Sequence, residues 1–520
     1  MKAATNIPSA DNAGSTRRST VAARLFVTVF VVYAIHFSSN VVRETYLAVT
    51  LGENFSVRVD EYLGLHPDLF SIQGRGAFIN SNPGASMFGA VPYAVARPII
   101  DGILRAKPEL ARPKPPGIYD DPRPNRSRFM NEARRRGLDV KLGLAAASMH
   151  TGLMVPLGAF GAVVMFLFLR RRLRDERKAL LLALLYAFAT PVFFRSAFLN
   201  QNGIVAHATL LTFVLLAGGR RSDAIEPLKA ESRRAQPSPR DIFLAGVLLG
   251  ITVLCDYSGL AIGLAFAVWL AVNEWRRGGS APMVRALALL AGGAAGPLVI
   301  LAFYQWVAFG NPFLPAQAYM PPTVLEARGW HGFTLPTPSL VAANLFDPRF
   351  GLFAFCPMLL GALASPFLAR RNAAEAITAR DNALIFGVSG ALLVFASSIQ
   401  FAALQFNTGV RYMVPAVPLL FIALVPLLLR LPRAVMLLLV VPTLVISWSV
   451  SMMRESVPDS LQRLLTAGPE LPWLTVLRKM SGAYIPFLAE HPSPLPLFAV
   501  VGLLFWLLWR PRKTESLTGF

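Results

Sequence analysis

Charged residues and cysteines are scarce in this chain. Only 15% of the 520 residues are Asp, Glu, Lys or Arg, whereas 54% are apolar. A soluble domain carries about 25% charged residues. The two cysteines, Cys255 and Cys356, both lie in apolar segments, which excludes a disulfide framework or a cysteine metal site. This composition indicates a protein whose surroundings are themselves apolar.

Nucleotide-binding motifs are also missing. The sequence has no GxxxxGK[ST] loop and no strand followed by GxGxxG, so it offers no recognisable phosphate loop. The residue-by-residue alternation of a membrane β-barrel strand is absent as well. We therefore expect any chemistry to take place on the extracytoplasmic side of the membrane. ATP and nucleotide sugars are absent there, so the substrate would have to arrive already activated.

Long apolar runs fill most of the chain. They are about 17 to 25 residues long, the length that a helix needs to cross about 30 Å of hydrocarbon. Helices satisfy their own backbone hydrogen bonds in lipid. We therefore predict an all-α, polytopic transmembrane protein with about twelve spans. The predicted spans are residues 22–39, 144–169, 178–194, 203–218, 241–258, 259–274, 284–309, 352–369, 383–400, 412–430, 434–452 and 493–509.

The formal net charge of +21 comes from clusters of Lys and Arg at the ends of these runs. Such clusters mark the cytoplasmic side of a membrane protein and do not indicate nucleic-acid binding. Twelve spans place the short clusters on one side, with both termini in the cytoplasm of an integral plasma (inner) membrane protein. The clusters begin at Arg17, Arg170, Arg220, Arg276, Arg370, Arg430 and Arg510.

This topology divides the chain unevenly. We predict an N-terminal cytoplasmic tail, a transmembrane module with two large extracytoplasmic loops, and a C-terminal part with a third outer loop, the last span and a cytoplasmic tail. These are residues 1–21, residues 22–452 with loops 40–143 and 310–351, and residues 453–520.

Two further segments need separate interpretation. Residues 85–104 are apolar enough to span, but a crossing there would reverse the side of the later basic clusters. We therefore predict a helix at the membrane interface, broken by Pro92 and Pro98. Residues 219–240 are rich in Ser, Pro and Arg and are predicted to be a flexible cytoplasmic linker.

The first outer loop concentrates acidic residues. Five of the chain's 29 acidic residues lie between positions 44 and 68. A carboxylate can take the proton of an acceptor hydroxyl during group transfer, so Glu44, Asp60, Glu61 and Asp68 are candidate catalytic residues. His66 could orient a substrate, or help the acids to bind a divalent cation. The alternative is a solvated loop whose acids balance nearby arginines.

A turn follows the acidic segment. Arg75 lies between two glycines, and Asn82 precedes Pro83 and Gly84. Glycine permits a close approach of backbone to ligand, which makes Arg75 and Asn82 candidate substrate contacts, although the same residues also suit a simple turn.

Three polar positions elsewhere could contact a lipid-linked substrate. His207 lies at membrane depth, where an ionisable group usually faces a cavity or a partner. Arg349 and Arg411 lie at the outer ends of spans, Arg411 beside Tyr412, where a guanidinium can bind phosphate with two hydrogen bonds. The alternatives are a structural histidine and arginines that reach toward the interface.

These segments, taken in order, resemble the GT-C superfamily of membrane glycosyltransferases, especially the group of protein O-mannosyltransferases and lipid A aminoarabinose transferases. Arg43-Glu44-Thr45-Tyr46 resembles the Asp-Glu-x-x-Tyr motif after the first span. Thr408-Gly409-Val410-Arg411-Tyr412 resembles a Gly-Pro-Arg-Tyr motif. The other similar segments are Phe78–Gly84, Tyr304 with Phe309–Phe313, and Arg349–Phe353.

The resemblance implies a GT-C-like fold, a polyprenyl-phosphate-linked sugar donor that enters from the bilayer, and inverting transfer on the outer face. A first-loop carboxylate would be the base, and Arg411 would steady the lipid phosphate. Arg43 and Tyr412, which lie in the two motifs, are further candidates for binding the substrate or its lipid phosphate. Two departures stand out. Arg43 occupies the position of the family's catalytic Asp, and the family's Lys-Pro-Pro-Gly turn reads Ser81-Asn82-Pro83-Gly84, so the phosphate-binding Lys is missing.

The leading hypothesis is thus transfer of a sugar to a cell-envelope glycan, lipid or protein, with membrane lipids as the other partners. An O-antigen polymerase or ligase is a variant of it. The alternative is a non-catalytic lipid or polysaccharide transporter or flippase, although no internal repeat is evident. Either Glu44, Asp60 or Asp68 has taken over the role of the base, or the chain is a divergent member whose activity is unknown or lost. The sequence leaves the sugar, the acceptor, any metal requirement and the oligomeric state open.

Overall fold

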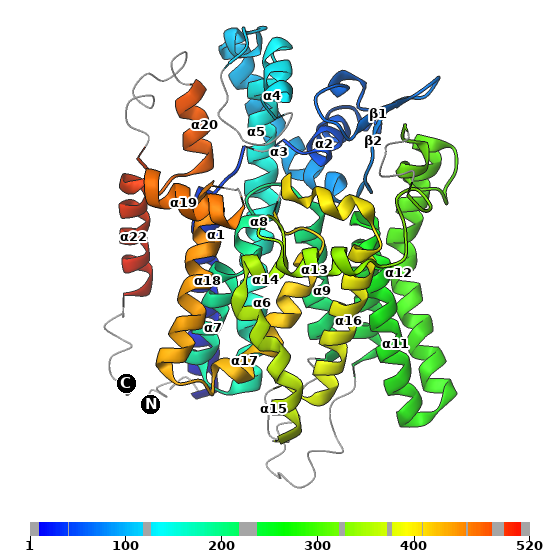
Figure 1. The fold of residues 1–520 in the computed structure, drawn as a ribbon, viewed down its shortest axis with the longest axis vertical. Helices are drawn as coiled ribbons and strands as arrows, with labels where there is room; N and C mark the ends of the chain where they lie inside the picture. Colours follow the sequence, from blue (N-terminus) through cyan, green and yellow to red (C-terminus); the bar gives the residue numbers. More distant parts are fainter. Residues whose placement is uncertain are drawn as a thin grey trace, which may run out of the picture.

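The protein is a bundle of helices with a smaller helical cap at one end (Figure 1). This computed structural model describes residues 10–39, 41–117, 126–217, 237–321, 328–371, 377–407, 409–453, 456–480 and 493–510. All of the predicted linker except residues 237–240 lies outside these ranges. Buried apolar side chains form one main core that continues from the bundle into the cap.

Helical structure is found in every stretch predicted to span the membrane. By length and composition, six helical stretches among the described residues can cross a membrane, and shorter apolar helices accompany them. The number of crossings stays a prediction. The bundle helices are α1 (Ala10–Ile35), α6 (Val155–Leu173), α7 (Glu176–Ala189), α9 (Gln201–Ala217), α10 (Pro239–Cys255), α11 (Ser258–Gly278), α12 (Ser280–Phe309), α16 (Ala379–Ser397), α17 (Val417–Leu428), α18 (Arg433–Met453) and α22 (Leu495–Trp509).

Shorter elements connect these helices. The predicted span at 352–369 is not one helix, because Pro357 lacks the N–H that would continue the helix, and a tighter 3-10 segment follows it. The short elements are α8 (Val192–Arg195), η5 (Ala316–Tyr319), α13 (Pro338–Phe346), α14 (Leu352–Phe355), η6 (Pro357–Ala364), α15 (Ser365–Arg371), η7 (Gln400–Asn407), η8 (Val414–Ala416), α19 (Val457–Ala467) and α20 (Pro472–Met480).

One long helix joins the bundle to the cap. α5 (Asp139–Met149), the π-helical turn η3 (His150–Met154) and α6 form a continuous stretch of 35 residues. At 1.5 Å per residue the stretch is about 52 Å long, whereas the hydrocarbon core is about 30 Å thick. About 20 Å must therefore extend beyond a membrane around the bundle, and α5 is the part that packs in the cap.

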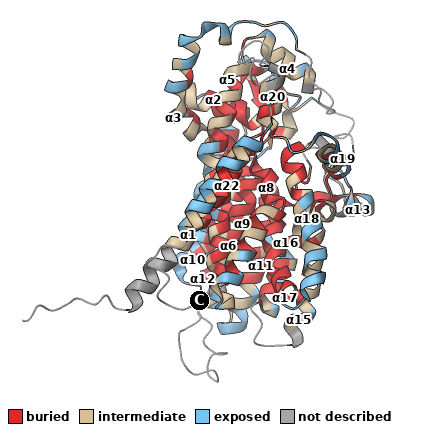
Figure 2. Ribbon diagram, turned by 90° about the vertical axis from the view of Figure 1, so that its left-hand side faces the viewer, coloured by how far each residue is buried: buried red, intermediate tan, exposed pale blue. Residues whose placement is uncertain are grey.

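The cap is formed by residues 43–111 and 126–149. Its remaining elements are α2 (Arg43–Asn54), η1 (Asp60–Tyr62), the antiparallel hairpin of β1 (Leu69–Ile72) and β2 (Gly76–Ile79), α3 (Gly84–Ala106), η2 (Pro108–Ala111) and α4 (Arg126–Arg135). Glu53 ties three helices together, since it accepts a hydrogen bond from Tyr93 (2.5 Å) and pairs with Lys141 (3.0 Å). Figure 2 shows the cap above the buried interior of the bundle.

The apolar segment predicted to lie at the interface forms α3. Pro92 and Pro98 lie inside this helix and do not break it, contrary to the prediction. Each proline removes one backbone donor, and the flanking turns keep their own hydrogen bonds. α3 begins beside the end of α10, where Gly84 approaches the carbonyl of Leu254, and it packs along α2 and α5. Its location at the membrane interface stays a prediction.

The opposite end of the bundle gathers the basic helix ends. Arg172, near the end of α6, donates to the carbonyl of Ala217 at the end of α9 (2.7 Å) and pairs with Asp381 at the start of α16 (3.3 Å). Three helix ends therefore meet at this end of the bundle, which the positive-inside pattern predicts to be the cytoplasmic one. The cap lies at the other end (Figure 1).

Candidate active site

A cavity of about 1810 Å³ lies between the cap and the bundle. Drug-sized ligands occupy pockets of about 300 to 1,000 Å³, so this one has room for a long ligand or for two substrates. Most of its wall is apolar. Its polar lining includes Arg43, Glu44, His66, Asp68, Asn80, Asn82, Arg195, Asn200, Gln201, Asp256, Tyr257, Gln305, Arg411 and Tyr412.

The start of α2 supplies the first acidic group. The chain leaves α1 at Ile35 and enters α2 at Arg43. Glu44 lies in the first turn of α2, where the positive end of the helix dipole favours a carboxylate. Its side chain is only 4% exposed and pairs with the Arg43 guanidinium (Nε to Oε1, 3.0 Å).

The hairpin supplies the second acidic group. Leu69 pairs with Ile79, so Asp68 and Asn80 flank the open end of the hairpin, where the Asn80 N–H donates to the Asp68 carbonyl (3.1 Å). The guanidinium of Arg43 reaches both side chains, Asp68 Oδ2 at 2.5 Å and Asn80 Oδ1 at 2.9 Å. Arg43 therefore connects the α2 carboxylate to the hairpin carboxylate.

These contacts shift the protonation equilibria of the cluster. Burial by itself would raise the pKa of Asp68, but the charges of Arg43, His66 and Arg411 outweigh burial and hold that pKa below its ordinary value. Burial lowers the pKa of His66, although Asp68 nearby acts in the opposite direction. The cluster is thus arranged to keep Asp68 ionised.

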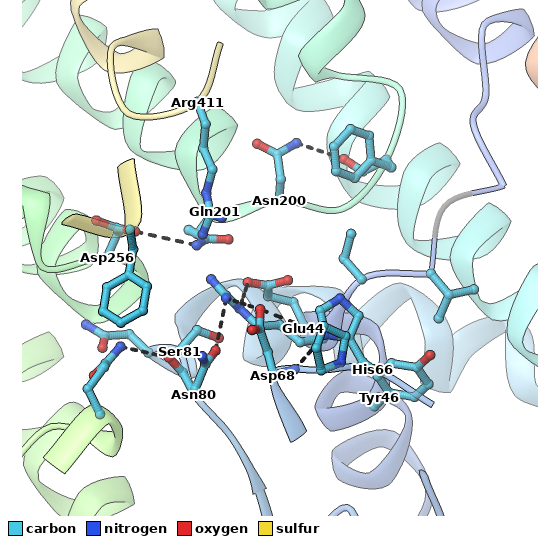
Figure 3. Close-up of a pocket in the computed structure, with 18 of the residues that line it drawn as sticks. Glu44, Tyr46, His66, Asp68, Asn80, Ser81, Asn200, Gln201, Asp256 and Arg411 are labelled. Atoms are coloured by element: carbon cyan, nitrogen blue, oxygen red, sulfur yellow. Dashed lines mark hydrogen bonds and ion pairs between the residues drawn. The ribbon is translucent and has the colours of Figure 1, made fainter. Parts of the chain in front are cut away.

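Two arginines face this cluster from the bundle. Arg411 points across the cavity toward Glu44 and Asp68 (Figure 3). Its backbone N–H and that of Tyr412 both donate to Gln405 Oε1 (3.1 and 3.0 Å), and its Nε donates to Asn202 Oδ1 (3.3 Å). Arg195 is 2% exposed and lines the same cavity.

The backbone before Arg411 depends on a glycine. Gly409 has φ +69°, in the left-handed region, and a Cβ at this position would meet the ring of Phe355 at 3.3 Å. Glycine adopts this conformation without the cost that other residues incur. Thr408, which belongs to the same predicted motif, lies outside the described residues.

Neutral polar groups line the cavity beside the arginines. Gln201 donates to Asp256 Oδ2 (3.5 Å), and Gln305 pairs with the Tyr257 hydroxyl (2.5 Å). Asp256 Oδ1 also accepts from the N–H of Ser258, the first residue of α11 (2.9 Å), and Asp256 lines the cavity.

The structure brings seven of the twelve predicted site residues to one cavity. These are Arg43, Glu44, His66, Asp68, Asn82, Arg411 and Tyr412. Asn82 is held by a hydrogen bond to the Val253 carbonyl (2.6 Å) at the end of α10, which orients its side chain.

The other five predicted residues lie away from the cavity lining. Asp60 pairs with Arg58 (2.8 Å) and accepts from the Ala77 N–H (2.6 Å), while Glu61 is exposed beside it. Arg75 packs against Gly310. His207 is buried in the bundle against Gly161. Arg349 is 57% exposed and pairs with Asp347 (2.8 Å).

Sequence reasoning missed Arg195 and the amides of Asn200, Gln201 and Gln305. Arg195 could have been found, because an arginine that directly follows the apolar run Val192–Phe194 is an ionisable group near membrane depth. The amides carry no such signal, since single polar residues are common at the ends of membrane helices.

Comparison with known proteins gives structural likeness alone. No family model and no curated protein matches the sequence. Solved structures similar to the chain include ArnT from Cupriavidus metallidurans bound to undecaprenyl phosphate, at 16% identity and a TM-score of 0.49, covering 94% of this chain and 75% of that one. The same protein in the apo state gives 15% identity, 93% and 74% coverage, and a TM-score of 0.47.

A third similar structure is the oligosaccharyltransferase of Archaeoglobus fulgidus, tethered to an acceptor peptide. It shares 13% identity and a TM-score of 0.43, and the match covers 96% of this chain and 60% of that one. At these identities and TM-scores, the assignment of an activity rests on the residues of this chain.

Proposed function

We propose that this chain is an integral membrane glycosyltransferase of the GT-C type. It would move a sugar from a polyprenyl-phosphate donor to a cell-envelope acceptor on the extracytoplasmic face, with inversion. The observation that carries the proposal is the cavity itself, which is lined by two carboxylates of the cap and two arginines of the bundle. The order of the sequence motifs and the basic clusters at the opposite end support the same assignment.

The arginines suit the phosphate of the donor. Arg195 and Arg411 both line the cavity, and guanidinium binds phosphate oxygens through paired hydrogen bonds. Apolar residues of α11 and α12, such as Leu260, Leu298 and Val299, line the cavity and are exposed to the surroundings of the bundle. A polyprenyl chain can lie against them while its phosphate contacts the arginines.

The sugar would lie between the arginines and the carboxylates. Gln201, Asp256, Tyr257 and Gln305 offer donors and acceptors for its hydroxyl groups. Glu44 is the proposed base. It takes the proton of the acceptor hydroxyl as that oxygen bonds to the anomeric carbon, and the bond to the phosphate oxygen breaks. Polyprenyl phosphate leaves with the bonding electrons, and one displacement inverts the anomeric carbon.

Asp68 is the second candidate base. Its lowered pKa makes it the weaker proton acceptor, because the strength of a general base falls with its pKa. We assign it the role of holding Arg43, and through Arg43 of orienting Glu44.

The test is transfer by single variants of the full chain in membrane vesicles, supplied with polyprenyl-phosphate-linked hexoses and pentoses and with an envelope fraction as acceptor. Glu44→Gln should lower transfer by about 100-fold or more, the usual contribution of a general base, and retain undecaprenyl phosphate binding. The matched control, Glu109→Gln, changes an exposed acid of the cap and should transfer normally. Unchanged transfer in both Glu44→Gln and Asp68→Asn would refute the assignment of the base. Transfer by the natural chain no greater than in vesicles without it would refute the enzyme hypothesis and favour the transporter.

A further inference from the structure

The acidic cluster of the candidate site already contains a positive charge, the guanidinium of Arg43. A cluster of acids beside a sugar phosphate suggests a divalent ion, which needs several carboxylate or carbonyl oxygens at about 2.0 to 2.6 Å. Among the residues that the structure describes, no group of three or more His, Cys, Asp or Glu side chains could hold a metal ion. The carboxylates of Glu44 and Asp68 instead converge on the guanidinium of Arg43.

The guanidinium of Arg43 occupies the place between the two carboxylates where a divalent ion would have to bind. Its side chain is only 11% exposed, and it contacts Glu44, Asp68 and Asn80 at 2.5 to 3.0 Å. These three contacts are oxygen atoms, the ligand type that Mg²⁺ and Mn²⁺ prefer. A divalent ion at their centre would have to displace the guanidinium, or bind beside its positive charge. The residues present therefore do not fit a divalent cation.

We propose that Arg43 takes the place of a divalent cation in this site. Its fixed charge holds the carboxylates of Glu44 and Asp68 together, and it joins α2 to the hairpin as a bridging metal would. Arg43 is thus a positioning residue, and the site works without a metal. The inference rests on the proposed function for what Glu44 then does, but the absence of a metal requirement can be measured separately.

If Arg43 replaces a metal ion, then replacing Arg43 by an acid should create a metal site. Arg43→Asp replaces the cation by a third carboxylate, on a shorter side chain that leaves room for an ion between the same oxygen atoms. Three carboxylates and the Asn80 amide oxygen are a typical oxygen ligand set for Mn²⁺. The variant should therefore gain a metal site that the natural chain lacks.

The test is Mn²⁺ binding to the purified full chain in lipid nanodiscs, followed by electron paramagnetic resonance. The natural chain should show no saturable site that depends on Glu44, so Glu44→Gln should leave its binding curve unchanged. Arg43→Asp should bind one Mn²⁺ per chain at least tenfold more tightly, and adding Glu44→Gln should abolish the gain. Arg43→Lys, which keeps the charge, should bind Mn²⁺ no better than the natural chain.

Two outcomes overturn the proposal. One is a Mn²⁺ site in the natural chain that Glu44→Gln or Asp68→Asn removes, a result that does not depend on the folding of any Arg43 variant. The other is sugar transfer by the natural chain that EDTA abolishes and Mn²⁺ restores. If the natural chain transfers no sugar under any condition, the proposed function fails, whereas the Mn²⁺ measurement still decides the role of Arg43.

Discussion

Replacing Arg43 by alanine tests the charge cluster by its effect on stability. The Glu44 side chain is 4% exposed and that of Asp68 is 30% exposed, so the change leaves one buried and one half-buried carboxylate without this partner. Breaking a fully buried ion pair costs about 3 to 5 kcal/mol. Because Asp68 is partly solvated, we expect a loss of about 2 to 4 kcal/mol.

The expected change in melting temperature follows from chain length. An unfolding entropy of about 2.1 cal/mol/K per residue gives about 1.1 kcal/mol/K for 520 residues, so the loss corresponds to about 2 to 4 °C. Differential scanning fluorimetry of the purified chain in detergent measures this shift. The matched control is Arg105→Ala, which removes an exposed arginine of the cap.

The pH dependence of the loss has a definite sign. The pKa of Asp68 is lowered below its ordinary 3.8 in the folded chain, so its pairing stabilises the fold above that pH and ceases to do so as the pH falls through the folded-state pKa. The difference between the natural chain and Arg43→Ala should be complete at pH 6 and shrink below about pH 4. Adding Glu44→Gln to Arg43→Ala should recover part of the loss. An equal difference at pH 7 and pH 3.5, or no recovery, would refute the charge argument.

Three further predictions concern other parts of the molecule. Arg411→Ala should weaken undecaprenyl phosphate binding about 10- to 100-fold in a nanodisc assay, the value of a charged hydrogen bond, and an unchanged affinity would remove Arg411 from the phosphate site. Gly409→Ala should cost about 1 to 2 kcal/mol, seen as a lower melting temperature, because of its φ of +69° and the nearby ring of Phe355. A spin label at Val95→Cys, on the exposed apolar side of α3, should be reached by oxygen more readily than by a water-soluble nickel complex, and the reverse would place α3 in water.

The broad organisation of the protein could be predicted from its sequence. Each predicted span contains helical structure. A segment in lipid has to satisfy its own backbone hydrogen bonds, which a helix does, and a helix that crosses the hydrocarbon core needs an apolar run of about 20 residues in the sequence. The α3 segment shows where local rules are too weak. Pro92 and Pro98 suggested a broken helix, but the helix continues through both because only two backbone donors are missing.

The candidate site was only partly visible in the sequence. Acidic density pointed to the first outer loop, but it could not separate Glu44 and Asp68, which line the cavity, from Asp60, which binds the hairpin backbone. The difference depends on which way each side chain of the loop points. Arg195 was missed because it comes close to Glu44 and Arg411 only when three distant segments meet.

The sequence alone determined the class of protein. A chain with so few charged residues, and with its basic residues grouped at the ends of apolar runs, has to place helices in a membrane. What only the tertiary structure decided is the partner of each charge. In the sequence, Arg43 stands where the resemblance leads one to expect an acid. From the sequence alone, this replacement indicates the loss of a base. The fold places its guanidinium between Glu44 and Asp68, and there it becomes the cation that holds them. Such pairing depends on distances of a few ångströms between segments up to 25 residues apart, which packing sets and local sequence does not.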